Sequence, residues 1–168
     1  MMPLIQAMFP ELVLMAVACA LLLMGAGRSA NVRRTSAWVA LLALIFVFVY
    51  QVMATGDPQG HVYADDSGTF RVFSLAQFIK LLSAGVGILF VLLAWPSNRE
   101  ATGNGSVDYA TECGEFFGLM LLSISGIFLV AGANDIITLF LGIELASIPT
   151  YIMVSVSRPV AAAQEAGV

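Results

Sequence analysis

The sequence predicts an all-α fold, a polytopic transmembrane helix bundle of about five spanning helices. Of its 168 residues, 60% are hydrophobic and 11% are charged, whereas a soluble domain usually carries about 25% charged residues. The mean hydropathy is +0.93. The apolar residues are gathered into runs of about 17 to 24 residues, and a helix of that length crosses a hydrocarbon core of about 30 Å. We expect residues 1–168 to form a single membrane domain.

The first predicted helix covers about residues 11–27. Pro10 and Glu11 precede the apolar run. Proline suits a first helical turn because it lacks an amide, and a carboxylate is favoured at the positive end of the helix dipole. Gly25 and Gly27 end the run. We expect Glu11 to act as an interface or capping charge.

The second and third predicted helices cover about residues 37–54 and 72–95. The second carries no charge, and Trp38 and Tyr50 lie near its ends, where aromatic residues mark the two membrane interfaces. The third contains Lys80 about eight residues from its start. Gly- and Asp-rich turn sequences separate the helices.

The fourth and fifth predicted helices cover about residues 114–133 and 135–157. Asn134 or Asp135 is expected to cap the fifth helix, since either side chain can accept from free amides. Residues 158–168 are expected to be the truncated start of a further helix. Small residues recur every seven positions along the fourth helix and predict close helix packing there: Gly118, Ser125 and Gly132.

Basic residues predict the orientation of the chain. With the N-terminus outside, five arginines fall in cytoplasmic segments and one, Arg71, falls outside, as the positive-inside rule requires. The expected location is the inner (plasma) membrane of a bacterium rather than an organelle. The five cytoplasmic arginines are Arg28, Arg33, Arg34, Arg99 and Arg158.

Glu144 is the main candidate for chemistry. It lies nine residues after Asp135, so it is roughly 14 Å into the membrane at 1.5 Å per residue. An unpartnered carboxylate at that depth costs several kcal/mol, and such residues usually move charge. The alternative is a permanently protonated glutamate that hydrogen-bonds a neighbouring helix. The same helical face carries Leu141, Ser147, Ile148 and Tyr151, and we expect it to point into the bundle.

Lys80, Ser147 and Tyr151 are further candidates. Lys80 is the one lysine of the chain and is expected about 12 Å deep, where its role is either functional or a snorkelling side chain that reaches the interface. Ser147 and Tyr151 offer hydroxyl groups on the face of Glu144. These three residues are the possible companions of the carboxylate.

Several functional classes are excluded by the sequence. Cys19 and Cys113 lack metal-type spacing, so no metal site is predicted, and both are expected to be small buried residues. The net charge of −4 gives no basic face for nucleic acid. No nucleotide-binding loop or haem-attachment motif is present, so no cofactor is expected to bind this chain.

One block of the sequence resembles a known family. The chain is similar to the antiporter-like proton-channel subunits of complex I, above all subunit N of NADH-quinone oxidoreductase, known in organelles as NADH dehydrogenase subunit 2. The specific match is ANDIITLFLGIEL at 133–145, and weaker matches lie at 10–12 and 78–80. The block is accompanied by 115–117, Ser147, Pro149 and Tyr151.

The resemblance implies a role for Glu144. In this family the corresponding glutamate pairs with a lysine on a later helix, and the pair passes protons across the membrane. That lysine is absent from these 168 residues, so the chain resembles only the N-terminal portion of the family fold. We expect either a fragment of a longer chain or a chain whose remaining helices are encoded separately. The complex as a whole uses NADH, FMN, iron–sulfur clusters and quinone.

The sequence is compatible with three functions. The first is a non-redox membrane subunit of a proton-pumping NADH–quinone oxidoreductase, a translocase whose partners are other membrane subunits and the lipid bilayer. The second is a subunit of a cation/proton antiporter, and the third is a non-transporting membrane scaffold. The closeness of the 133–145 block to subunit N favours the first.

Overall fold

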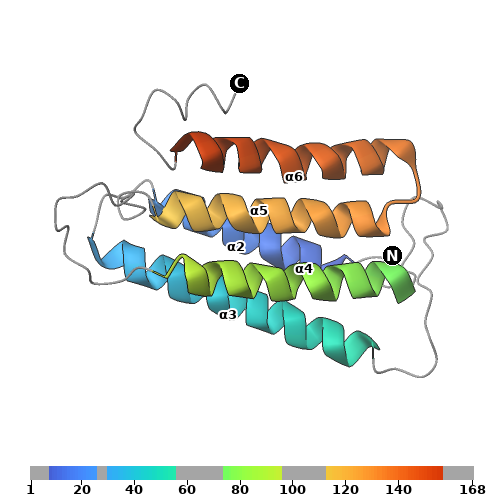
Figure 1. The fold of residues 1–168 in the computed structure, drawn as a ribbon, viewed down its shortest axis with the longest axis horizontal. Helices are drawn as coiled ribbons and strands as arrows, with labels where there is room; N and C mark the ends of the chain where they lie inside the picture. The colour runs from blue at the N-terminus through green and yellow to red at the C-terminus, as the bar shows by residue number, and fades with distance from the viewer. Residues whose placement is uncertain (1–7, 26–29, 56–73, 96–112, 157–168) are drawn as a thin grey trace.

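A computed structural model describes residues 8–25, 30–55, 74–95 and 113–156. These residues form five helices and no extended strand: α2 Phe9–Gly25, α3 Ala30–Thr55, α4 Ser74–Leu93, α5 Cys113–Gly132 and α6 Ile136–Val156. The predicted all-α bundle is therefore confirmed. Figure 1 shows α6 on one side, α5 with α2 behind it in the middle, and α4 with α3 on the other side.

Four of the described helices are long and apolar enough to cross a membrane, namely α3, α4, α5 and α6. The predicted number was about five. Helix α2 is apolar but has 17 residues, which corresponds to about 25 Å of rise. It packs lengthwise against α3 and α5, so it belongs to the bundle although it is the shortest of the five.

The start of α3 differs from the prediction. The helix was expected from about residue 37 but begins at Ala30, whereas its apolar span is Thr35–Ala54. Arginine is a good helix former, so a helix can continue through Arg33 and Arg34 beyond the apolar span. The apolar pattern of the sequence therefore predicted the apolar span of α3. It did not predict the polar extension at the start of the helix.

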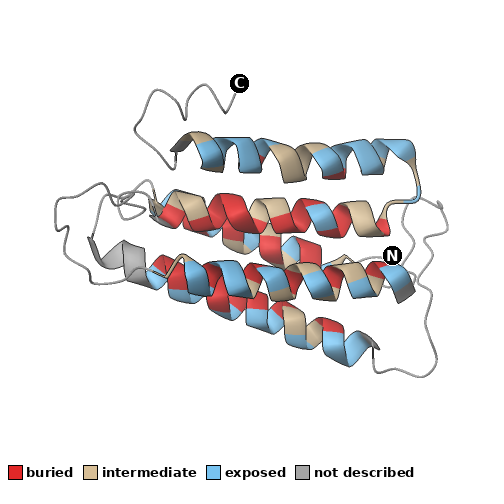
Figure 2. Cartoon of the chain, viewed as in Figure 1, coloured by how far each residue is buried: buried red, intermediate tan, exposed pale blue. Residues whose placement is uncertain are grey.

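The hydrophobic core lies among α2, α3, α4 and α5, where Figure 2 shows the buried residues concentrated. Helices α2, α3 and α4 each contact α5. Small residues bring α2 and α5 close: a Cβ added at Gly118 would lie 2.9 Å from the Leu22 side chain, and one at Gly114 would lie 2.8 Å from the Gly25 Cα. The close approach predicted from the small residues of 114–133 thus includes Gly118 against α2.

Helix α6 packs against a single described helix, α5. A Cβ added at Gly126 would lie 2.5 Å from the backbone nitrogen of Ala146, so the two backbones touch at this point. The Ser123 hydroxyl donates to the Ala146 carbonyl at 2.9 Å and lies 3.1 Å from the Thr150 hydroxyl. Small residues and hydroxyl groups therefore hold α6 in place.

Asp135, one of the two capping residues that the sequence offered, caps α6. Its Oδ1 accepts from the Thr138 amide at 2.6 Å, and its Oδ2 accepts from the Thr138 hydroxyl at 3.0 Å. The hydrogen bond from the Thr138 backbone amide is the largest cause that lowers the pKa of this carboxyl below its ordinary value. The turn between α5 and α6 is thus fixed by a charged side chain outside the apolar spans.

Some predictions fall on residues outside the described ranges. These include the helix expected to start in 158–168 and the arginines Arg28, Arg71, Arg99 and Arg158. At the described end of α4, the Trp95 ring packs edge-on against the Trp38 ring, with centroids 4.9 Å apart. Trp38 was expected at a membrane interface, and its partner in the structure is this second tryptophan.

Candidate functional site

Glu144 lies eight residues after the start of α6, roughly 12 Å along the helix. Its side chain is half-buried. Gly142 and Ala146 form the contact with α5, and Glu144 is two residues from either one, which corresponds to about 200° around the helix. Its carboxylate forms no hydrogen bond or ion pair with any residue that the structure describes.

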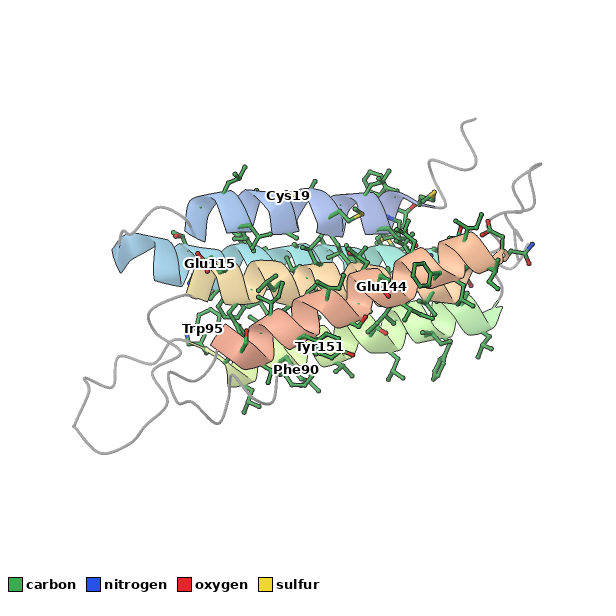
Figure 3. The ribbon with its side chains drawn as sticks, turned by 90° about the horizontal axis from the view of Figure 1, so that it is seen from above. Cys19, Phe90, Trp95, Glu115, Glu144 and Tyr151 are labelled. Carbon is green, nitrogen blue, oxygen red and sulfur yellow. The ribbon has the colours of Figure 1, made fainter. Side chains whose placement is uncertain are left out.

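The face of Glu144 was expected to point into the bundle, and this expectation is wrong for the described helices. Tyr151 and Leu141 are both 59% exposed, and Ile148 is 50% exposed. Figure 3 labels Glu144 and Tyr151 on α6, the helix nearest the viewer. The physical reason is that α5 binds the smaller face of α6, which lets the two backbones approach closely.

Ser147 and Tyr151 do not form a network with Glu144. The Ser147 hydroxyl donates to the Ile143 carbonyl of its own helix at 2.7 Å, which is a common bond for a serine within a helix. Tyr151 shares the face of Glu144 without a hydrogen bond between the two side chains. The structure therefore places these residues on one surface of α6, where the Ser147 hydroxyl also lies 3.5 Å from the backbone carbonyl of Glu144, and no side chain of the three bonds to another.

Lys80 is paired, and its partner is Glu11. Nζ of Lys80 lies 2.5 Å from Oε1 of Glu11, and both residues are 1% exposed. The snorkelling alternative for Lys80 and the interface role expected for Glu11 are thus both wrong. A buried charge is tolerated when an opposite charge accompanies it, and this pair lies between α2 and α4.

The helix directions explain how residues 69 positions apart meet. Helices α2 and α4 begin on the same side of the bundle (Figure 1). Glu11 lies in the first turn of α2 and Lys80 is the seventh residue of α4. A lysine side chain can extend back along its helix toward the N-terminus, so its ammonium group comes level with the first turn of α2.

A third helix closes the pair on another side. Nζ of Lys80 lies 5.9 Å from the ring centroid of Phe128 in α5, and that ring is fully buried. Cations are attracted to aromatic faces within about 6 Å. Oε2 of Glu11 is also buried, and it has no hydrogen-bond partner. The pair thus holds one carboxylate oxygen whose acceptor capacity is unused.

Sequence reasoning missed Glu11 because a glutamate at a helix start has an ordinary explanation as a dipole partner. A usable signal was present in the predicted orientation. With the N-terminus outside, Glu11 and Lys80 both lie near the outer ends of their helices, and they are an acid and a base in helices otherwise free of charge. The pairing of two such groups in an apolar bundle is a general expectation.

Cys19 was expected to be buried, and this is wrong. Its side chain is exposed on α2 (Figure 3), because it lies on the face of the helix that no described helix covers. No group of three or more metal-ligating side chains gathers anywhere in the described ranges.

Together, the long apolar helices, the buried ion pair and the mid-helix carboxylate define a multi-pass membrane protein with ionisable groups inside its spans. No family model matches the chain. Curated proteins do match it. The chain is 30% identical over 163 residues to NADH-quinone oxidoreductase subunit N 1 of Rhizobium meliloti and 31% identical over 166 residues to subunit N of Methylobacterium nodulans.

These matches cover 97% and 99% of this chain. A further relative, the F(420)H(2) dehydrogenase subunit N of Methanosarcina mazei, is 31% identical over 88% of the chain. The chain is therefore a relative of subunit N of NADH-quinone oxidoreductases, as its 133–145 block predicted. It spans about a third of the length of the curated relatives it matches, 31% and 32% for the first two.

Proposed function

We propose that the chain is a membrane subunit of a proton-pumping NADH–quinone oxidoreductase, in which Glu144 contributes to proton translocation coupled to quinone reduction. The observation that carries the proposal is the relation to subunit N proteins over nearly the whole chain. The position of Glu144 supports it, because a carboxylate in the middle of an apolar helix is usually a group that handles charge.

Within this proposal the chain carries out no redox step. NADH, FMN, the iron–sulfur clusters and quinone would bind to other subunits, since the sequence lacks a nucleotide-binding loop and a cluster-type cysteine pattern. The N-terminus would face outward across a bacterial plasma membrane. Glu144 would exchange its proton with a basic partner on another helix, and its position on the face of α6 opposite α5 leaves room for such a helix.

The test is the substitution Glu144→Gln in the assembled complex, reconstituted into liposomes. Glutamine keeps the size and polarity of the side chain but cannot release a proton. We expect the number of protons translocated per NADH oxidised to fall several-fold, while the amount of assembled complex stays unchanged. The matched control is Glu115→Gln, because Glu115 lies in the first turn of α5 and is expected to leave proton translocation unchanged.

Normal proton translocation by the Glu144→Gln complex would remove this residue from the mechanism. A proton flux that depends on sodium or potassium and proceeds without NADH would instead favour the antiporter function. Loss of assembly alone, with a normal proton yield from the complex that remains, would favour a scaffold. The three functions thus predict different results for one variant.

A further inference from the structure

The Glu11–Lys80 pair has no role in the function proposed above. It lies on the opposite side of α5 from α6, since α2 and α4 contact α5 and have no contact with α6. Glu144 therefore cannot be the partner of either residue within the described bundle. A separate explanation is needed for a pair of which each member is 1% exposed.

Stability is a weak explanation for such a pair. Removing two charges from water costs several kcal/mol per ion, and apolar residues of similar size often serve as well or better. This pair also leaves Oε2 of Glu11 buried without a hydrogen-bond partner. Buried polar atoms are nearly always satisfied in native proteins, so an unsatisfied one calls for a specific explanation, such as a bound water, an ion or a catalytic role.

The surroundings limit what that occupant can be. Apart from the pair, α2 contributes one titratable group, the exposed Cys19. Helix α3 contributes Tyr50, whose ring packs on Phe9 at 5.5 Å, and α5 contributes Glu115 at the end of the bundle opposite Glu11. The charged residues of α2 and α4 are those of the pair itself, and a net charge of zero leaves little attraction for a metal ion. A proton is the occupant that one free carboxylate oxygen fits.

We propose that the Glu11–Lys80 pair is a second proton-exchange site, separate from Glu144, which takes protons from the water phase at the end of the bundle where α2 and α4 begin. A proton from hydronium adds to Oε2 of Glu11 and leaves a water molecule behind. The charge of the pair changes from 0 to +1, and no electrons are transferred. The Nζ–H group still donates to Oε1, and the Phe128 ring still faces the ammonium.

The position of the pair suits exchange with water. Glu11 is two residues from the start of α2, about 3 Å of rise, and Lys80 is six residues from the start of α4, about 9 Å. The buried Gln51 lies at the same end, because its neighbour Tyr50 contacts Phe9. The carboxylate is therefore a short distance along the bundle from the end where α2 and α4 begin, and the buried Gln51 is a further polar residue at that end.

The experiment is an infrared pH titration of the complete complex, reconstituted in liposomes with isotope-labelled glutamate. As the pH is lowered, we expect a carboxylic-acid band that disappears in Glu11→Gln. The band should persist in Glu144→Gln and in the control Glu115→Gln. Because of that persistence, a failure of the proposed role of Glu144 and a failure of this site give different results.

A second variant separates proton exchange from a structural role. Glu11→Gln combined with Lys80→Met removes both charges, so it leaves no buried charge unpaired. We expect this complex to assemble and to translocate fewer protons per NADH than the unchanged complex. Glu11→Asp keeps a carboxyl group and should retain the band.

Two results would overturn the proposal. One is a titration without any band that depends on Glu11. The other is a doubly substituted complex that assembles and translocates protons normally, because the pair would then act as a structural link between α2 and α4 and nothing more.

Discussion

The two sides of α5 provide opposite environments for an acidic residue. On one side, α2, α3 and α4 pack against α5 and enclose Glu11 with Lys80. On the other side, α6 packs alone, and Glu144 remains half-buried without a partner among the described residues. Within the described bundle, 61% of the α5 span is buried but 11% of the α6 span.

The position of an acid within an apolar helix therefore does not by itself determine its environment. Glu11 lies near a helix end and looked like a capping charge, yet it is almost completely enclosed. Glu144 lies deep in its helix and looked enclosed, yet the described helices leave it accessible. Neighbouring helices, more than depth along one helix, determine the environment of an ionisable group.

The largest expected effect is on the enclosed side. Lys80→Met leaves Glu11 buried without its cation, which should lower the free energy of unfolding by about 3–5 kcal/mol. Thermal unfolding in detergent, followed by circular dichroism, measures the change. The combined variant Glu11→Leu and Lys80→Met should recover most of this loss, and equal destabilisation by the single and combined variants would show that the charges are not coupled.

A smaller effect is expected at the contact between α5 and α6. Gly126→Val places side-chain atoms where Ala146 now lies, and such overpacking typically costs about 1–3 kcal/mol. Because Ser123 and Thr150 touch across this contact, cysteines at both positions should crosslink, and Gly126→Val should reduce the yield. Gly85→Ala is the control, since its added Cβ would meet nothing closer than 3.6 Å. An unchanged yield would mean that Gly126 does not set the distance between the helices.

A still smaller effect on stability is expected at Glu144. The side chain has no partner to lose among the described residues, so Glu144→Leu should change the free energy of unfolding of the chain by no more than about 0.5 kcal/mol. The same thermal unfolding measurement applies. A loss comparable with that of Lys80→Met would show that Glu144 is enclosed and paired, and it would remove the contrast between the two sides.

The smallest expected effect is a pH dependence at the start of α6. The Thr138 backbone amide lowers the pKa of Asp135, so the folded state holds its carboxylate more strongly than the unfolded chain does. The stabilisation is complete above the ordinary aspartate pKa of about 3.9 and is lost as the pH falls through the lower folded pKa. Hydrogen exchange in the first turn of α6 should therefore rise in acid. Asp135→Asn keeps an acceptor and should abolish that rise; a rise of equal size in this variant would assign it to another group.

The positions of most helices could be predicted from the sequence, because a membrane-spanning helix is recognised by the length of its apolar run. The helix predicted at 114–133 is observed at Cys113–Gly132, and the one predicted at 135–157 is observed at Ile136–Val156. A cap at Asn134 or Asp135 was also predictable, because capping depends on the next few residues alone, and the structure shows that Asp135 is the capping residue. The family resemblance likewise rested on local sequence at 133–145.

The candidate sites were harder to predict from the sequence, because they depend on which helix faces lie together. The sequence identified Lys80 and Glu144 as ionisable residues within apolar helices, but it offered several partners and orientations for each. Pairing of Lys80 with Glu11 required that α2 and α4 begin on the same side and pack around Phe128. The sequence of either helix alone does not determine the distance between the Lys80 and Glu11 side chains.

The sequence by itself determined the class of protein, the approximate spans, a cap at Asn134 or Asp135 and the relation to subunit N, because each of these follows from hydropathy or from neighbouring residues. Tertiary structure alone decided that Glu11 is enclosed with Lys80 and that α5 takes the glycine face of α6 and leaves Glu144 on the other. The physical reason is that burial and ion pairing arise between helices, where backbones that carry small residues approach most closely.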